Sequence, residues 1–309
     1  MELESNLQNK ANVSIGQWGG RINMVIDTHV HYYDSRTRSN WFANRMPDLA
    51  EYNISFAEIG INYFDIDSMV AIMTKFERCI GVVPGQHPKN ISADTDVNLI
   101  FDYVTKRLDL YRNQVIGLKT GLDYHWVTDE CVRKRQRELL RLFLDFAAER
   151  KMAVVLHIRS RVSEGDGVRQ ADEDMLTILK EMKFQDAMVL HCFNGNTDLV
   201  LRYLVENENT YFGIGGSVTY PNNERLIKAV KMIPRNRLLL ETDGPYLKPI
   251  RPDMTRPHGK KNSSLNLPII IDKLAAILEM TSVEVEEMTS KNACDFYKLN
   301  FDREEIELK

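Results

Sequence analysis

The chain has 309 residues, of which 43% are hydrophobic, so it can form a large core in one barrel-sized domain or two smaller ones. Its 40 basic and 44 acidic residues give a net charge of −4, so the net charge does not favour binding to a polyanion such as nucleic acid. Any contact with nucleic acid would need a local basic patch. The four cysteines are scattered without a CxxC motif, and no stretch resembles a signal sequence or membrane span. We therefore expect a cytoplasmic protein with free thiols.

Residues 1–22 are polar and show no clear period, so we predict an N-terminal extension before a single domain over residues 23–309. Eight apolar runs predict strands at residues 25–31, 54–61, 79–83, 115–118, 153–156, 187–190, 211–214 and 238–240. Predicted helices separate them at residues 41–49, 66–76, 97–111, 129–151, 172–182, 198–207 and 223–232, and two more follow at 268–278 and 283–292. Eight alternating strands and helices predict a closed α/β structure, the (β/α)8 TIM barrel.

The first predicted strand ends in two histidines, His29 and His31. Side chains alternate along a strand, so both rings point the same way, about 7 Å apart along the chain. The pair could converge on one metal ion or be two surface histidines. The remainder of the chain must decide between these readings.

Further polar residues follow other predicted strands. His87 follows the third strand, Lys119 the fourth, His157 the fifth, His191 the sixth and Asp243 the eighth. Carboxyl ends of barrel strands meet on one face, where active sites form, so these residues should become neighbours. Imidazoles with a carboxylate suit Zn²⁺ or Mn²⁺ better than an oxygen-only Mg²⁺ or Ca²⁺ site. The sequence therefore predicts a metal centre at this face.

The motifs resemble, in order and spacing, those of the TatD family of metal-dependent deoxyribonucleases. They are Asp27-Thr28-His29-Val30-His31, Gly85-Gln86-His87-Pro88, Gly121-Leu122-Asp123-Tyr124, His157-Ile158-Arg159, His191-Cys192-Phe193-Asn194-Gly195, Glu241-Thr242-Asp243-Gly244-Pro245-Tyr246-Leu247 and Asn292-Ala293. The resemblance spans about residues 24–300. It implies a TIM barrel, one or two divalent metal ions (Zn²⁺, Mn²⁺ or Mg²⁺) and hydrolysis of phosphodiester bonds in DNA.

The matching motifs also imply roles for the residues. His29, His31 and Asp243 would hold one ion, and His157 and His191 the other. Asp243 would also take a proton from the attacking water, and Glu241 would orient a ligand or act as a catalytic carboxylate. The predicted substrate-binding residues are His87, Arg159, Tyr124 and Lys260.

One position departs from the family pattern, because Lys119 stands where the family has a glutamate that bridges two metals. An ammonium beside divalent cations is disfavoured, so Lys119 would lose its proton, turn away or replace one metal ion with its own charge. Alternatively, CO₂ could convert it to a bridging carbamate, as in related amidohydrolase barrels.

The loop after the eighth strand is rich in basic residues, which could bind the backbone of a nucleic acid or simply be solvated. Aromatic residues that follow strand ends could stack on bases or pack in the core; they are Tyr32, Tyr33, Trp41, Tyr124 and Trp126. We predict DNA, single-stranded or at its 3′ ends, as the partner. The alternative functions are an amidohydrolase that cleaves amides, lactones or esters with a carboxylated lysine, and a non-catalytic barrel subunit of a larger complex.

Overall fold

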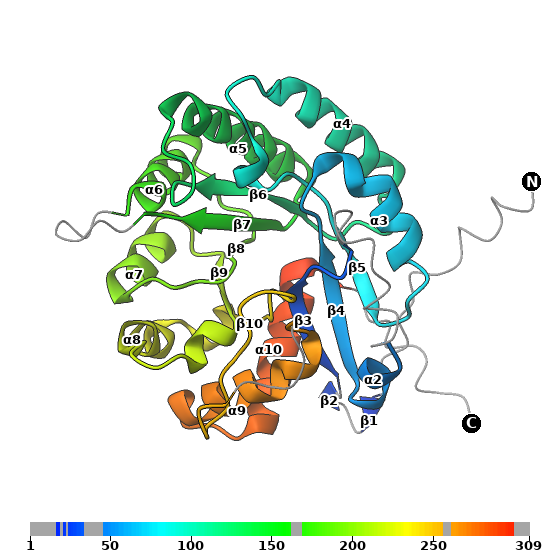
Figure 1. The fold of residues 1–309 in the computed structure, drawn as a ribbon, viewed down its shortest axis with the longest axis vertical. Coiled ribbons are helices and arrows are strands. Elements are labelled where there is room, and N and C mark those ends of the chain that lie inside the picture. Colours follow the sequence, from blue (N-terminus) through cyan, green and yellow to red (C-terminus); the bar gives the residue numbers. More distant parts are fainter. Residues whose placement is uncertain are drawn as a thin grey trace, which may run out of the picture.

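The computed structural model describes residues 17–18, 21–22, 24–33, 46–161, 169–255 and 261–299. Its central part consists of eight parallel strands that Figure 1 shows inside a ring of helices. The strands are β3 (Val25–Val30), β4 (Ile54–Ile59), β5 (Cys79–Val83), β6 (Leu118–Asp123), β7 (Val154–Arg159), β8 (Met188–Leu190), β9 (Thr210–Ile214) and β10 (Leu238–Leu240). Strands adjacent in sequence pair with one another within two groups, β3 to β5 and β6 to β10.

Hydrogen bonds close these two groups into a barrel. On one side, Ile116 N donates to Val82 O at 3.0 Å, and a parallel bridge joins Gly85 to Lys119. On the other side, His31 N donates to the carbonyl of Gly244 at 2.7 Å. A closed sheet leaves no free edge. The predicted (β/α)8 barrel is therefore confirmed.

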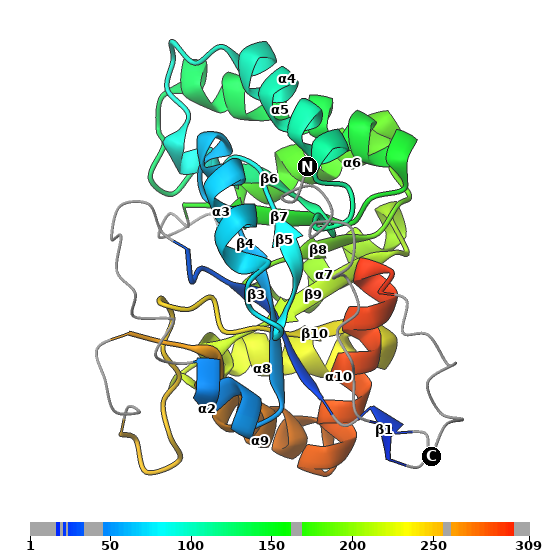
Figure 2. The same cartoon turned by 90° about the vertical axis from the view of Figure 1, so that its right-hand side faces the viewer.

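Helices follow the strands and cover the outside of the barrel (Figures 1 and 2). They are α2 (Met46–Glu51), α3 (Ile66–Met73), α4 (Val97–Leu110), α5 (Glu130–Arg150), α6 (Gln170–Met182), α7 (Thr197–Glu206), α8 (Glu224–Met232), α9 (Leu267–Leu278) and α10 (Ser282–Tyr297). Local sequence defines their ends: Asp96 and Asp129 cap the N-termini of α4 and α5, and Thr281 and Glu284 form a capping box at α10. None of the helices in the described ranges is both long and apolar enough to cross a lipid bilayer.

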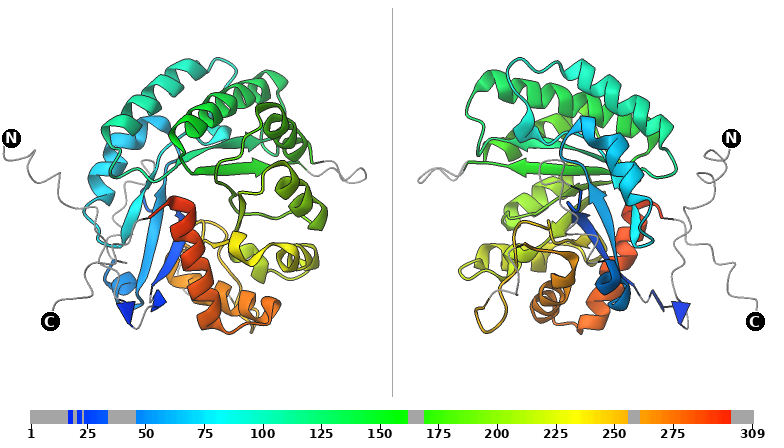
Figure 3. Two further views of the ribbon diagram at one scale, coloured as in Figure 1. Left: turned by 180° about the vertical axis from the view of Figure 1, so that it is seen from behind. Right: turned by 45° about the vertical axis from the view of Figure 1, so that its right-hand side comes forward.

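The barrel interior is filled by apolar side chains that alternate along the strands, among them Ile26, Ile59 and Val155. Helix α10 lies across one end of the barrel, as the left view of Figure 3 shows. Its Tyr297 hydroxyl donates to the carbonyl of Thr28 at 2.8 Å. With this end covered and the interior packed, the open end for chemistry is the opposite one, formed by the carboxyl ends of the strands.

Several element boundaries differ from the sequence predictions, and α10 extends five residues beyond its predicted end at residue 292. Two of the differences change which residues lie in strands. The fourth barrel strand begins at Leu118 rather than Val115 and continues to Asp123, because Gly121 allows the backbone to stay paired with β7. Lys119 therefore lies within a strand. In the predicted extension, β1 (Gln17–Trp18) and β2 (Arg21–Ile22) pair antiparallel. The sequence did not predict these strands, because two residues are too few to show a periodic pattern.

Candidate metal centre

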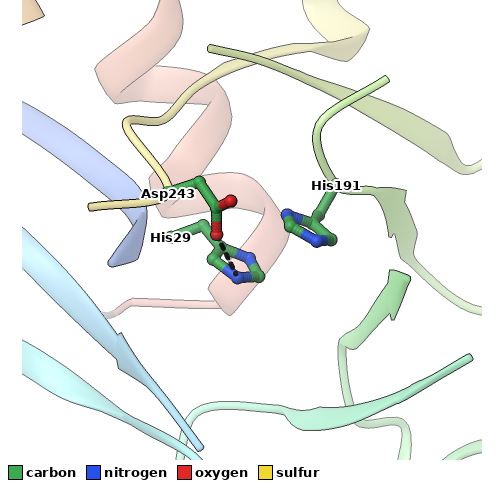
Figure 4. A group of neighbouring side chains, drawn as sticks. All are labelled: His29, His191 and Asp243. Carbon is green, nitrogen blue, oxygen red and sulfur yellow. Dashed lines mark ion pairs between the residues drawn. The ribbon is translucent and has the colours of Figure 1, made fainter. Parts of the chain in front are cut away.

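The predicted metal-ligating side chains come together at the carboxyl ends of the strands. His29 lies on β3, Lys119 on β6 and His157 on β7. His31, His191 and Asp243 lie just beyond β3, β8 and β10. Figure 4 shows His29 beside Asp243, with His191 facing them from the other side. The structure thus unites residues separated by more than two hundred positions in the chain.

His29, His31 and Asp243 form a triangle of potential ligand atoms. The two Nε2 atoms are 3.3 Å apart, and Asp243 Oδ1 lies 3.3 Å from His31 Nε2 and 3.6 Å from His29 Nε2. Ligand atoms about 2.0–2.2 Å from a tetrahedral ion lie at about this separation from one another. The triangle therefore fits a divalent cation without rearrangement.

A neighbouring carbonyl fixes the tautomer of His31. Its Nδ1 lies 2.7 Å from the carbonyl oxygen of Ile59, which can only accept, so Nδ1 carries the hydrogen. In the neutral ring, Nε2 then presents a lone pair toward His29 and Asp243. This is the arrangement in which a metal-ligating histidine is oriented through its other nitrogen.

A second pair of imidazoles, His157 and His191, repeats this design. His157 Nδ1 lies 3.3 Å from His191 Nε2, and His157 Nε2 lies 3.0 Å from Asp123 Oδ2. Hydrogen bonding to His157 holds the pKa of the Asp123 carboxyl below its ordinary value despite the opposing effect of burial. The carboxylate accepts from Nε2, which leaves the Nδ1 lone pair of His157 facing His191.

Stacking joins the two groups into one centre. The rings of His29 and His191 are nearly parallel with centroids 3.8 Å apart, and ligand atoms of His29, His191 and Asp243 all lie within 4.8 Å of one another. Burial lowers the pKa of His29 and His191 well below the ordinary histidine value, and nearby positive charge adds to this effect. Both rings are therefore neutral near pH 7, as metal binding requires.

Lys119 lies among these groups, completely buried. Its Nζ makes no hydrogen bond within the described part of the chain. Burial lowers the pKa of Lys119 to about 8, and the nearby carboxylates of Asp243 and Glu241 oppose this shift. An unpaired buried amine is costly, so the position of Lys119 favours a partner that the protein chain does not supply.

Glu241 lies beside His191, and one ligand atom each of Glu241, His191 and Cys192 lie within 4.8 Å of one another. Its Oε1 accepts from the backbone N–H of Cys192 and lies 3.7 Å from His191 Nδ1. Burial and the charge of Asp243 raise the pKa of Glu241 to about 8. The side chain is packed so closely that a Cβ on Gly213 would approach Glu241 Oε2 to 2.2 Å. This geometry suits the orienting role predicted for Glu241 better than direct attack.

The backbone around the centre is unusual. Cys192, which follows the candidate ligand His191, and Asp243, itself a candidate ligand, have positive φ values of 50° and 53°, a region that side-chain-bearing residues rarely adopt. A Cβ on Gly85 would lie 1.9 Å from the carbonyl oxygen of Lys119, so only glycine permits this close approach of neighbouring strands. Such local strain gathers at functional sites.

The predicted substrate-binding residues have different surroundings. His87 lies beside the centre, with its ring centroid 4.3 Å from that of His157, and Arg159 is exposed at the end of β7. The structure does not bring Tyr124 into the histidine cluster: its ring is 1% exposed, and its hydroxyl lies 2.7 Å from Asp174 Oδ2. Lys260 lies outside the described residues.

Sequence reasoning missed two buried carboxylates that support the candidate ligands. One is Asp123, which orients His157. The other is Asp27, which accepts from the backbone N–H groups of His29 and Thr242 and from the hydroxyl of Ser264. Asp27 thereby ties β3 to the segments that follow β10. Strand alternation could have revealed it, because Asp27 lies two residues before His29 and shares its face.

Comparison with known proteins agrees with this geometry. A family model described as TatD related DNase matches residues 26–298. The uncharacterized metal-dependent hydrolase YabD of Bacillus subtilis is 27% identical over 279 residues, which cover 90% of this chain and all of YabD. The crystal structure of the TatD homologue YJJV from Escherichia coli superimposes with a TM-score of 0.75 at 19% identity, over 89% of this chain and 98% of that one.

A TatD family protein from Entamoeba histolytica gives a TM-score of 0.72 at 18% identity, again over 89% of this chain and 98% of that one. At such identities the two solved structures establish the fold alone. The family model, by contrast, covers most of the sequence and every candidate ligand. This chain therefore belongs to the TatD family of metal-dependent hydrolases.

Proposed function

We propose that this protein hydrolyses phosphodiester bonds in DNA, at 3′ ends or in single strands, with one or two divalent ions. The observation that carries the proposal is the triangle of His29, His31 and Asp243, whose facing atoms are 3.3–3.6 Å apart. The second pair, His157 and His191, adjoins it. The description of the matching family as a DNase supports a phosphodiester substrate.

The chemistry divides between the ion and the side chains. A divalent cation bound here supplies Lewis acidity, which activates water and polarises a phosphoryl oxygen. Asp243 turns Oδ1 toward the histidines, and its Oδ2 makes no hydrogen bond within the described residues, so this oxygen can accept the proton of the attacking water. Imidazole ligands favour Zn²⁺ or Mn²⁺ over Mg²⁺.

Two side chains suit the phosphate. His87 Nδ1 accepts from the backbone N–H of Lys89, so in the neutral ring Nε2 carries the hydrogen and can donate to a phosphoryl oxygen. Burial lowers the pKa of His87 well below its ordinary value, which keeps the ring neutral. Arg159 can bind phosphate through two parallel N–H groups. We further propose a cytoplasmic location, which the four free cysteines support.

A chelation and metal add-back assay on end-labelled single-stranded DNA tests this function. We expect cleavage that EDTA abolishes, that Zn²⁺ or Mn²⁺ restores, and that Asp243→Ala removes. The exposed Asp253→Ala, in the loop after β10, is the matched control and should retain activity. Cleavage that survives both EDTA and Asp243→Ala would refute the proposal. Absence of turnover on any substrate would favour the non-catalytic subunit.

One observation favours a second candidate, an amidohydrolase that cleaves amide, lactone or ester bonds. Lys119 Nζ is buried beside both groups of ligands and has no hydrogen-bond partner in the described ranges. The neutral amine could attack CO₂ to form a new N–C bond and release a proton, giving a carbamate whose oxygens can ligate metal. Native mass spectrometry with metal counting tests this: an unmodified Lys119 in a one-metal protein would eliminate the carbamate.

A further inference from the structure

An exposed tryptophan lies beside the metal centre. Trp126 follows β6 on the catalytic face, and 58% of its side chain is exposed. The backbone N–H groups of His125 and Trp126 donate to Asp123 Oδ1 at 3.1 and 3.0 Å. The other oxygen of Asp123 orients His157. One buried carboxylate therefore sets both the tautomer of a candidate ligand and the position of the indole.

Two cations border the indole from the neighbouring strands. Lys89 Nζ lies 5.1 Å from the ring centroid of Trp126, and Arg159 Cζ lies 5.6 Å from it. Lys89 comes two residues after His87, whose ring donor we assign to the phosphate, and Arg159 two residues after His157. The tryptophan and its cations are thus held by the same short segments that position the reacting centre.

Unlike these cations, two arginines of α5 pair with carboxylates. Between α5 and α6, Arg137 pairs with Glu130 and Asp174, and Arg141 with Glu181. Within the described part of the chain, by contrast, neither Lys89 nor Arg159 has a carboxylate at salt-bridge distance. Their charge therefore remains available for an anionic ligand.

The exposed indole and its two neighbouring cations together indicate which class of ligand could bind here. An exposed indole provides a flat apolar surface on which a nucleobase can stack, and stacking on aromatic side chains tolerates any base. Cations on its border complement phosphates on either side of the stacked base. A protein or lipid partner would not require a planar surface bordered by two cations that lie on the same segments as His87 and His157.

We propose that Trp126, Lys89 and Arg159 form a nucleotide subsite in which the indole stacks on an unpaired base adjacent to the scissile phosphate. This inference rests on the proposed nuclease function, because it assumes a nucleic-acid substrate. In this subsite Lys89 and Arg159 contact the backbone phosphates. Trp126 fixes the register of the strand relative to the metal centre without taking part in bond cleavage.

Binding measured without turnover tests the subsite. Fluorescence anisotropy would use the full chain in EDTA, with a labelled oligothymidylate and an abasic oligomer of equal length as probes. We expect Trp126→Ala to weaken oligothymidylate binding about 5- to 100-fold and Trp126→Phe to weaken it less than about threefold. Abasic binding should change less than about twofold. Lys89→Met and Arg159→Met should each reduce the slope of log K against log salt by about 0.7.

The matched control is Tyr52→Ala, because Tyr52 is 62% exposed but precedes β4 at the opposite end of the barrel. Circular dichroism checks that each variant folds. Unchanged oligothymidylate binding by Trp126→Ala, or equal loss of both probes, would overturn the subsite, as would absence of binding by the wild type.

The proposed function and the subsite can fail separately. Binding that depends on Trp126, without metal-dependent cleavage of the same oligomer, would support the subsite and remove the nuclease proposal. Cleavage accompanied by wild-type binding of Trp126→Ala would overturn the subsite and leave the nuclease proposal intact.

Discussion

Replacing Asp123 by asparagine should weaken metal binding while leaving the adjacent turn in place. Asp123 accepts three hydrogen bonds: Oδ1 from the backbone N–H groups of His125 and Trp126, and Oδ2 from His157 Nε2 at 3.0 Å. Asparagine can keep the first two through its carbonyl oxygen, but its amide presents hydrogens where Oδ2 accepted one. His157 must then lose that contact or move its own hydrogen to Nδ1, which removes the lone pair that faces His191.

The magnitude follows from the type of contact. Loss of an outer partner of a metal-ligating histidine costs about 10- to 100-fold in metal affinity. A hydrogen bond to a charged group contributes about 1.5–3 kcal/mol to stability, so Asp123→Asn should also lower the free energy of unfolding. Competition titration against a chromophoric chelator measures the affinity for Zn²⁺ or Mn²⁺. Urea unfolding of the metal-free protein measures the stability separately.

A conservative change at a remote helix cap is the control. Asp96→Asn at the N-terminus of α4 replaces a carboxylate that accepts from two backbone N–H groups and contacts no candidate ligand. We expect it to leave metal affinity unchanged. If Asp123→Asn lost stability but bound metal as tightly as the wild type, the assignment of Asp123 as the residue that orients His157 would be refuted.

Three further predictions concern the centre and its surroundings. His31→Ala removes an atom 3.3 Å from both His29 Nε2 and Asp243 Oδ1, so the chelator titration should show a loss of metal affinity greater than that of Asp123→Asn. Burial lowers the pKa of Lys119 in the folded protein to about 8, from an ordinary value of 10.5 in the unfolded chain. Between these two pKa values the unfolded metal-free chain binds one proton more than the folded protein. The free energy of unfolding of the wild type, relative to that of Lys119→Met, should therefore rise with pH by about 1.4 kcal/mol per pH unit in this range and stay constant below it. Urea titrations from pH 7 to 10 that give parallel profiles for the two proteins would contradict this. Thr281→Ala breaks the capping box of α10 and should cost about 1 kcal/mol in urea unfolding with no change in metal affinity.

Much of the fold could be predicted because its signals are local. Eight apolar runs alternate with helical periods, and all eight barrel strands occur within a few residues of their predicted positions. Helix ends could also be predicted from the sequence, because capping residues such as Asp129 lie at the helix ends that they stabilise. The beginning of β6 was misplaced because the strand is held by pairing to β5 and β7, which are remote in sequence.

Sequence alone predicted the candidate ligand types, the strands near which they lie and the departure at Lys119. This was possible because the carboxyl ends of barrel strands converge on one face, independently of the length and conformation of the loops that connect them. Tertiary structure decided which ring nitrogen faces the centre, since that depends on the carbonyl of Ile59 and the carboxylate of Asp123. It also decided that Tyr124 is buried whereas Trp126 is exposed between two cations. Burial and hydrogen-bond partners arise from contacts between distant segments, and no local pattern specifies them.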